Sequence, residues 1–174
     1  MYDAGKASAA RTHAEVFQSK SPISTTTPSW TGGCQCGRVR YLLASAPTGA
    51  HFCHCRMCQR AVGGPFAALT SVPTGDLTWT SGAPKWFASS NLAKRPFCGD
   101  CGTPLGFQYV GSPRINVSIG SLDDPEQAPI STHYGVESRW SFVKICDALP
   151  QVTTADDPDS PVSLSALISN QGAP

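Results

Sequence analysis

The sequence lacks long apolar segments and has almost no excess of charge. No apolar run approaches the roughly 20 residues that a membrane-spanning helix needs, so we expect no membrane partner. Residues 1–20 are polar and contain no apolar core of signal-peptide length, which favours a reducing, cytoplasmic location. Lys and Arg together (13) barely exceed Asp and Glu (12), so bulk charge gives no reason to expect nucleic-acid binding.

Long helical periodicity and internal repeats are also lacking, whereas the chain has 16 Gly and 15 Pro. Apolar residues instead alternate with polar ones, as in residues 38–43, where Val39, Tyr41 and Leu43 share one face. The same pattern or an enrichment in β-forming residues predicts further strands at 66–72, 76–80, 85–88, 105–110, 114–119 and 141–146. We therefore expect a mainly β fold of antiparallel sheets.

The chain has polar ends and a middle part that contains the predicted strands. A chain of 174 residues can bury one ordinary core, so we expect a single domain. We assign residues 1–29 to a polar N-terminal extension with a short helix near 9–17, and residues 30–150 to the β domain. Residues 151–174 form a C-terminal tail, in which 162–168 could pack as a short amphipathic turn of helix.

Seven of the eight cysteines fall into three tight clusters. The clusters are Cys34-x-Cys36, Cys53-x-Cys55-x-x-Cys58 and Cys98-x-x-Cys101. Four thiolates close a structural zinc site, whereas three protein ligands leave one position for water or substrate. The spacing predicts two Zn²⁺ ions per chain, one structural ion on the outer two pairs and one catalytic ion on the middle triplet. Loading both ions would bring the formal charge from +1 to about −2.

Three other uses of the cysteines are weaker. A disulfide framework needs an exported protein. A redox pair at Cys98 and Cys101 is less favoured than a metal site, because the glycine-rich turn around these two cysteines is typical of a zinc knuckle. Iron–sulfur proteins use other spacings. At the triplet, His51 or His54 could instead supply a fourth ligand and close the site, although His54 lies between two ligands and would be strained.

Other side chains are weaker candidates. Four arginines could hold carboxylates of a substrate, although most surface arginines are only solvated: Arg56, Arg60, Arg95 and Arg139. His133 could shuttle a proton or be a satisfied loop histidine. We interpret Trp79, Trp86 and Trp140 as core or rim residues, Gly63-Gly64-Pro65 as a turn, and Cys146 as a buried small residue rather than an eighth ligand.

Several blocks of the chain resemble the glutathione-dependent formaldehyde-activating enzyme family, which also includes centromere protein V. The blocks are 32–41 (GGCQCGRVRY), 53–60 (CHCRMCQR) with 63–66 (GGPF), 97–105 (FCGDCGTPL), and 119–125 (IGSLDDP) followed by His133 and 136–140 (VESRW). The resemblance implies a zinc-stabilised β-tent (Mss4-like) fold, a structural zinc, and a second zinc linked to glutathione chemistry, with a small thiol and an aldehyde as substrates.

The reaction implied by this resemblance is that of S-(hydroxymethyl)glutathione synthase. This carbon–sulfur lyase adds the thiol of glutathione to formaldehyde or a related small aldehyde, or catalyses the reverse cleavage. An open site with three thiolates suits this reaction, because its net negative charge makes the metal a weak Lewis acid towards water and favours sulfur as the fourth ligand. The alternative is a non-catalytic zinc-stabilised binding module or a receptor for glutathione or thiol adducts.

Overall fold

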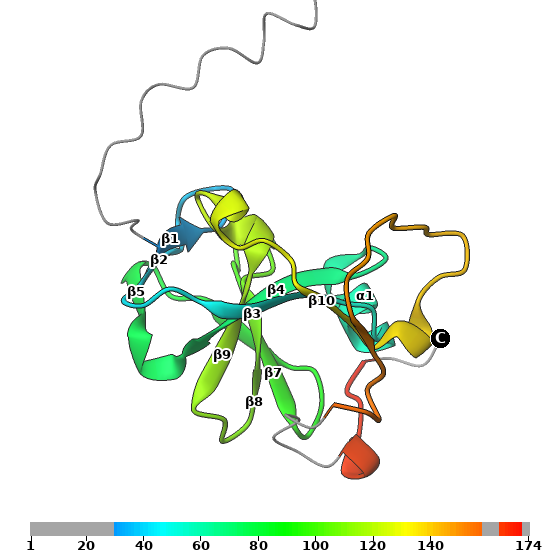
Figure 1. Ribbon diagram of the computed structural model, residues 1–174. Coiled ribbons are helices and arrows are strands. Elements are labelled where there is room, and N and C mark those ends of the chain that lie inside the picture. Colours follow the sequence, from blue (N-terminus) through cyan, green and yellow to red (C-terminus); the bar gives the residue numbers. More distant parts are fainter. Residues whose placement is uncertain (1–29, 158–163, 172–174) are drawn as a thin grey trace, which may run out of the picture.

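The computed structural model describes residues 30–157 and 164–171, which form two β-sheets (Figure 1). The small sheet has the order β1 (Trp30–Gly33), β2 (Arg40–Leu43) and β5 (Leu77–Ser81). The large sheet has the order β11 (Gln151–Val152), β10 (Thr132–Tyr134), β3 (Thr48–Cys53), β4 (Ala67–Pro73), β9 (Arg114–Ser118), β8 (Gly106–Tyr109), β7 (Ala93–Phe97) and β6 (Lys85–Ala88). The prediction of a mainly β fold is confirmed.

Strand pairs are antiparallel with two exceptions, because β10 runs parallel to both of its neighbours, β3 and β11. The described chain has one α-helix, α1 (Arg56–Val62), which follows β3. The remaining helical turns are the 3₁₀ segments η1 (Thr74–Asp76), η2 (Ile119–Ser121), η3 (Pro125–Gln127), η4 (Val136–Ser138) and η5 (Leu164–Ala166). Among the described residues, no helix combines the length and the apolar character needed to cross a membrane.

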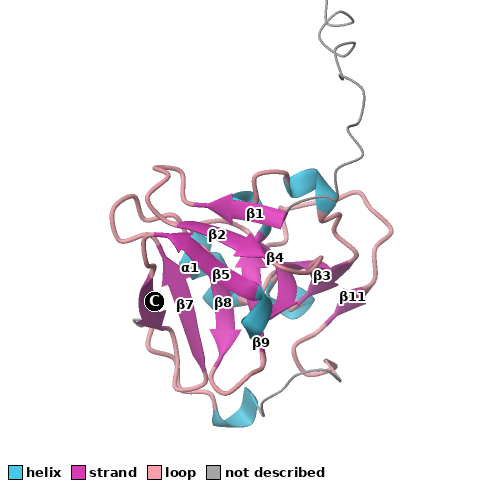
Figure 2. Ribbon diagram, turned by 90° about the vertical axis from the view of Figure 1, so that its left-hand side faces the viewer, coloured by secondary structure: helices cyan, strands magenta, loops and turns pink. Residues whose placement is uncertain are grey.

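The core lies between the two sheets, with the small sheet packed over the middle of the large one (Figure 2). Alternation along β2 buries Tyr41 and Leu43, whereas Leu42 between them is exposed. The Tyr41 hydroxyl is 2.8 Å from the hydroxyl of Ser121, and its ring meets that of Trp79 edge-on. A buried tyrosine therefore keeps a hydrogen-bond partner while its ring fills the space between the sheets.

Six predicted strands correspond to β2, β4, β5, β6, β8 and β9. The predicted strand at 141–146 is wrong. Val143 and Ile145 are half-buried in the expected alternation, but no neighbouring strand pairs with this segment, because β11 occupies the edge next to β10. Cys146 is consequently exposed, contrary to the prediction that it is buried. The predicted helix near 9–17 lies outside the described residues, and the described part of 162–168 contains one 3₁₀ turn, η5.

Candidate metal centres and the adjoining pocket

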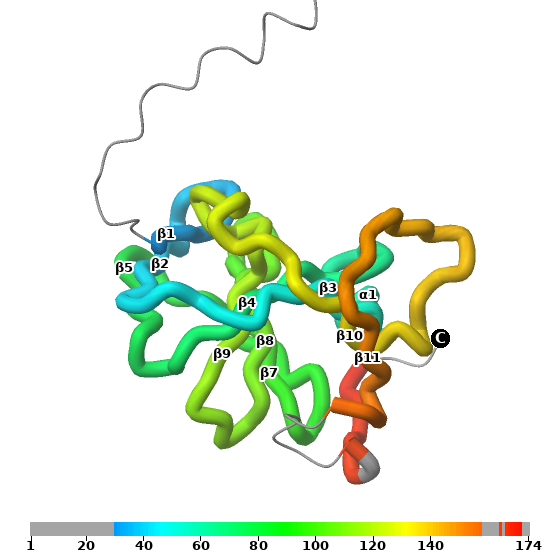
Figure 3. Tube along the Cα trace, in the orientation of Figure 1, coloured from blue at the N-terminus to red at the C-terminus, as the bar shows by residue number. Residues whose placement is uncertain are grey.

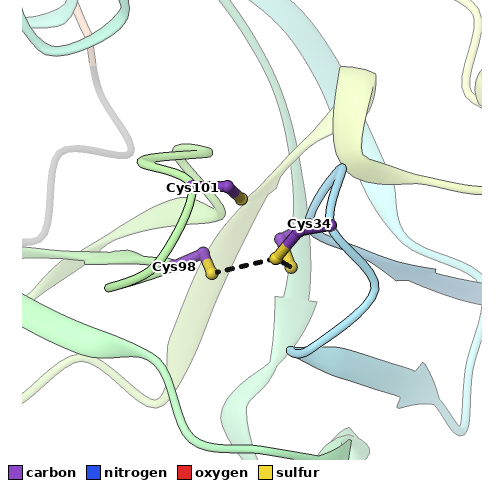
Figure 4. A group of neighbouring side chains, drawn as sticks. Cys34, Cys98 and Cys101 are labelled. Carbon is purple, nitrogen blue, oxygen red and sulfur yellow. Dashed lines mark hydrogen bonds between the residues drawn. The ribbon is translucent and has the colours of Figure 1, made fainter.

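The two outer cysteine pairs meet at one point. Cys34 and Cys36 lie on the turn between β1 and β2, and Cys98 and Cys101 lie on the turn that follows β7. Figure 4 shows Cys98 and Cys101 directing their sulfur atoms towards Cys34. All four sulfur atoms are within 4.8 Å of one another, and two of the separations are 3.4 and 3.8 Å. A tetrahedral zinc with Zn–S bonds of 2.3 Å would place its sulfurs about 3.8 Å apart, so the group could hold such an ion.

Backbone and hydroxyl groups support this four-sulfur group. The N–H of Val39 donates to the sulfur of Cys34 over 3.3 Å. On the second turn, hydrogen bonding to Thr103 lowers the pKa of Cys101 to about 6. Gly102 follows Cys101 with a φ of 76°, in the left-handed region that glycine adopts without strain. Each turn therefore favours one thiolate, at Cys34 and at Cys101, and directs it towards a common centre.

The middle triplet forms the second group. Cys53 ends β3, Cys55 precedes α1 and Cys58 lies in the first turn of α1, so the end of a strand and the start of a helix carry the three cysteines. The three sulfur atoms lie within 4.8 Å of one another. Among the described residues, no histidine or carboxylate joins this group. The three sulfurs thus leave a place for a fourth ligand that does not come from the described chain.

A buried arginine lies beside the triplet. The Nη2 atom of Arg95 donates to the sulfur of Cys58 over 3.5 Å, and the guanidinium lies 4.8 Å from the ring centre of Phe107. Hydrogen bonds from Cys53 and Cys55 hold the pKa of Cys58 well below its usual range against the opposing effect of burial, and Arg95 lowers it further. One member of the triplet is therefore predisposed to be a thiolate.

Gln59 fixes the segment that carries the triplet. Its side chain is buried, and its amide nitrogen donates to the carbonyl oxygens of His54 (2.7 Å) and Ser138 (2.9 Å). Its amide oxygen accepts from Trp140 over 3.0 Å and from Arg56 over 3.2 Å. All of its hydrogen-bonding capacity is used, which ties α1 to the chain after β10.

The side chain of His54 points away from the sulfurs. Its Nε2 atom lies 2.8 Å from Nδ1 of His133, whose Nε2 is 3.1 Å from both carboxylate oxygens of Asp147. Both histidines are almost fully buried. This arrangement explains why His54 is absent from the metal-ligand group although it lies between two of its members. It also makes His133 a satisfied buried histidine.

A pocket of about 470 Å³ lies between α1, β4 and β7, and Arg95, which contacts Cys58, is one of its lining residues. Among the residues that the structure describes, Arg60 and Arg95 are the only charged ones that line it, and none of the lining residues is acidic. Phe87, Phe97 and Val62 contribute apolar walls. The volume falls in the range of small-molecule sites. An anionic molecule with an apolar part fits this lining.

The four candidate arginines and the predicted glycine turn have different places in the structure. Arg60 and Arg95 reach the pocket, Arg56 supports Gln59, and Arg139 does not line this pocket. Gly63 ends α1, as expected for a turn. No local sequence pattern pointed to Gln59 or Asp147, because most of the groups that they contact lie elsewhere in the chain.

Comparison with known proteins agrees with these features. The model of the glutathione-dependent formaldehyde-activating enzyme family matches residues 29–138. An uncharacterized lyase of Schizosaccharomyces pombe is 30% identical over 83 residues, which are 48% of this chain and 60% of that protein. The crystal structure of a Rhodobacter sphaeroides protein matches 57% of this chain and 96% of its own, with 26% identity and a TM-score of 0.42. Since the family match spans most of the chain and includes all seven clustered cysteines, the protein belongs to the glutathione-dependent formaldehyde-activating enzyme family.

Proposed function

We propose that the protein is a zinc-dependent carbon–sulfur lyase that joins the thiol of glutathione to formaldehyde or a related small aldehyde, and that it also catalyses the reverse cleavage. Membership of the family and the lyase name of the yeast relative support this class of reaction. The observation that carries the proposal is the triplet of Cys53, Cys55 and Cys58, which could hold a metal ion without a fourth ligand from the described chain.

The donor set favours a thiol as the fourth ligand. Three thiolates and one Zn²⁺ carry a net charge of −1, which favours soft sulfur over activation of water. When bound there, the metal would lower the pKa of a coordinated thiol and make it a better nucleophile. Arg95 then has a defined role, because its buried positive charge offsets the additional negative charge that a substrate thiolate brings.

The addition is balanced without a redox partner. The thiol sulfur forms a bond to the carbonyl carbon, and the thiol proton ends on the former carbonyl oxygen, giving a hydroxymethyl thioether. The reverse reaction breaks that carbon–sulfur bond and returns the proton to sulfur. A substrate with a free thiol requires a reducing compartment, and we place the protein in the cytoplasm.

The second group has a different proposed role. Cys34, Cys36, Cys98 and Cys101 supply four sulfurs, which leaves no ligand position open, and they connect the β1–β2 turn to the turn after β7. We assign a structural zinc to this group, for a total of two zinc ions per chain. Such an ion links distant parts of the chain and contributes to folding free energy directly.

X-ray absorption at the zinc edge tests the proposal. With both sites loaded, the average number of sulfur ligands per zinc should rise by about one half on addition of glutathione, because only one of the two ions gains a sulfur ligand. Cys146→Ser is the matched control, since this exposed cysteine lies outside both groups. An unchanged set of zinc ligands at saturating glutathione would favour a non-catalytic binding module. The same conclusion would follow if a nitrogen atom already occupied the fourth ligand position before glutathione is added.

A further inference from the structure

Residues 164–171, called here the C-terminal strap, are packed against the hairpin between β6 and β7. Asn91 on this hairpin accepts from the N–H of Ile168 over 2.7 Å and donates to the carbonyl of Ala166 over 2.9 Å. Asn170 binds the same hairpin through its backbone, which donates to Ser89, and through its side chain, which donates to Ala88. The strap lies beyond residue 138, where the family match ends.

The burial of two serines on the hairpin shows that the strap is part of the packed structure. Ser89 is fully buried and Ser90 is 3% exposed, although both lie in the connection between two strands, where polar residues are normally solvated. Ser90 forms a β-bridge with Ser169 of the strap. The strap thus covers this connection and satisfies its backbone groups.

The end of the strap reaches the pocket and the helix that carries Cys58. Asn170 and Gln171 line the pocket together with Pro96 and Phe97 of β7. The side-chain amide of Gln171 donates over 2.9 Å to the carbonyl oxygen of Met57, which immediately precedes Cys58 in α1. Figure 3 shows this red segment rising beside β11 towards α1. One segment therefore spans from the β6–β7 hairpin to the helix that carries Cys58.

We propose that the strap is a specificity element, forming the wall of the pocket that holds the part of the thiol substrate distant from its sulfur. This inference rests on the proposed function. The wall restricts water beside Arg95, a buried cation whose Nε has no hydrogen-bond partner in the described structure, and thereby strengthens its attraction for a carboxylate. The site consequently favours a large thiol with carboxylate groups over a small neutral thiol.

Detachment of the strap tests this inference in the full-length protein. The double variant Asn91→Ala, Gln171→Ala removes three of the side-chain hydrogen bonds that hold the strap and leaves every cysteine in place. Titration calorimetry should show glutathione binding weakened about tenfold, with binding of 2-mercaptoethanol and zinc content unchanged. Gln171→Ala alone should give an intermediate loss. Gln127→Ala is the control, because this exposed side-chain amide donates to nearby Asp124 and does not line the pocket.

The outcomes separate the inference from the proposed function. If the wild type binds glutathione and the double variant binds it equally well, the strap has no role in specificity and the inference is wrong, while the lyase proposal stands. Equal weakening for both thiols, with zinc retained, would also overturn the inference, since the strap would then act on the sulfur site itself. If the wild type binds neither thiol, both proposals fail.

Discussion

His54 and His133 are joined by a 2.8 Å contact between Nε2 and Nδ1, although 79 residues separate them in the sequence. Because the carboxylate of Asp147 can only accept, Nε2 of His133 carries a proton. Nδ1 of the same ring faces Nε2 of His54, which completes the chain. This chain of three groups holds the residue between Cys53 and Cys55 and thereby fixes the backbone of the triplet.

The first prediction concerns this chain. His133→Leu should lower the free energy of unfolding by about 1–3 kcal/mol, because it leaves His54 Nε2 buried without a hydrogen-bond partner. Asp147→Asn should cost less, since Asp147 is partly exposed and water can replace it. Urea unfolding of zinc-loaded protein measures both. A larger loss for Asp147→Asn than for His133→Leu would contradict this description.

Gln59 gives a nearly isosteric test. Gln59→Glu replaces the amide nitrogen that donates to His54 and Ser138 with an oxygen that faces two carbonyl oxygens. We expect a loss of about 2 kcal/mol or more in the free energy of unfolding, because a buried charged group lacks donors there. Thermal and urea unfolding would measure it. Gln127→Glu, at an exposed amide, is the control, and equal stability of the two variants would show that the Gln59 network is unimportant.

The two cysteine groups should respond differently to substitution. Cys98→Ser should unfold or aggregate the protein, because Cys98 is fully buried and a structural zinc contributes on the order of 10 kcal/mol to folding. Cys55→Ser should leave the fold largely intact and abolish activity. Zinc content and thermal unfolding distinguish them. Equal losses of thermal stability in both variants would refute separate structural and catalytic roles.

The carboxylate of Asp123 should make the free energy of unfolding depend on pH. Hydrogen bonds from Arg40 and Thr31 lower the pKa of Asp123 below that of the unfolded chain, about 3.9. The lowered pKa means that this stabilisation is fully present above about pH 5 and is lost as the pH falls through the folded-state value. Asp123→Asn should thus cost up to about 1 kcal/mol at pH 6, and the difference from wild type should shrink below pH 4. Arg40→Met should show the same trend, and a difference that grows as the pH falls would contradict the assignment.

The sequence predicted the elements that depend on local pattern. Alternation identified β2, where Tyr41 and Leu43 face the core, and cysteine spacing identified both groups of sulfurs. It missed β3, because Gly49 and His51 interrupt an apolar pattern. It also missed β7, where a proline and two cations, including Arg95, are poor strand signals. Arg95 can be buried there only because the cysteine triplet and an aromatic ring from other elements surround it.

Long-range contacts explain the other omissions. Neither the Asp147–His133–His54 chain nor the contact of Gln171 with Met57 has a local pattern, because each joins segments that meet only after the sheets have formed. Residues 141–146 show the opposite situation. The alternation in burial that is typical of a strand is present, but no strand in the described structure pairs with this segment. Local pattern therefore predicted six of the strands and the two cysteine groups, whereas the pocket wall depended on tertiary structure.

The reaction itself is tested most directly by exchange NMR of glutathione with formaldehyde, at matched protein and thiol concentrations for wild type and Cys55→Ser. The rate of adduct exchange should exceed the spontaneous rate with wild type only. The advantage should be greatest below the ordinary thiol pKa of about 8.5, where free glutathione is mostly protonated. Identical exchange rates for the two proteins, with glutathione still bound to wild type, would contradict the lyase proposal and identify a thiol receptor instead.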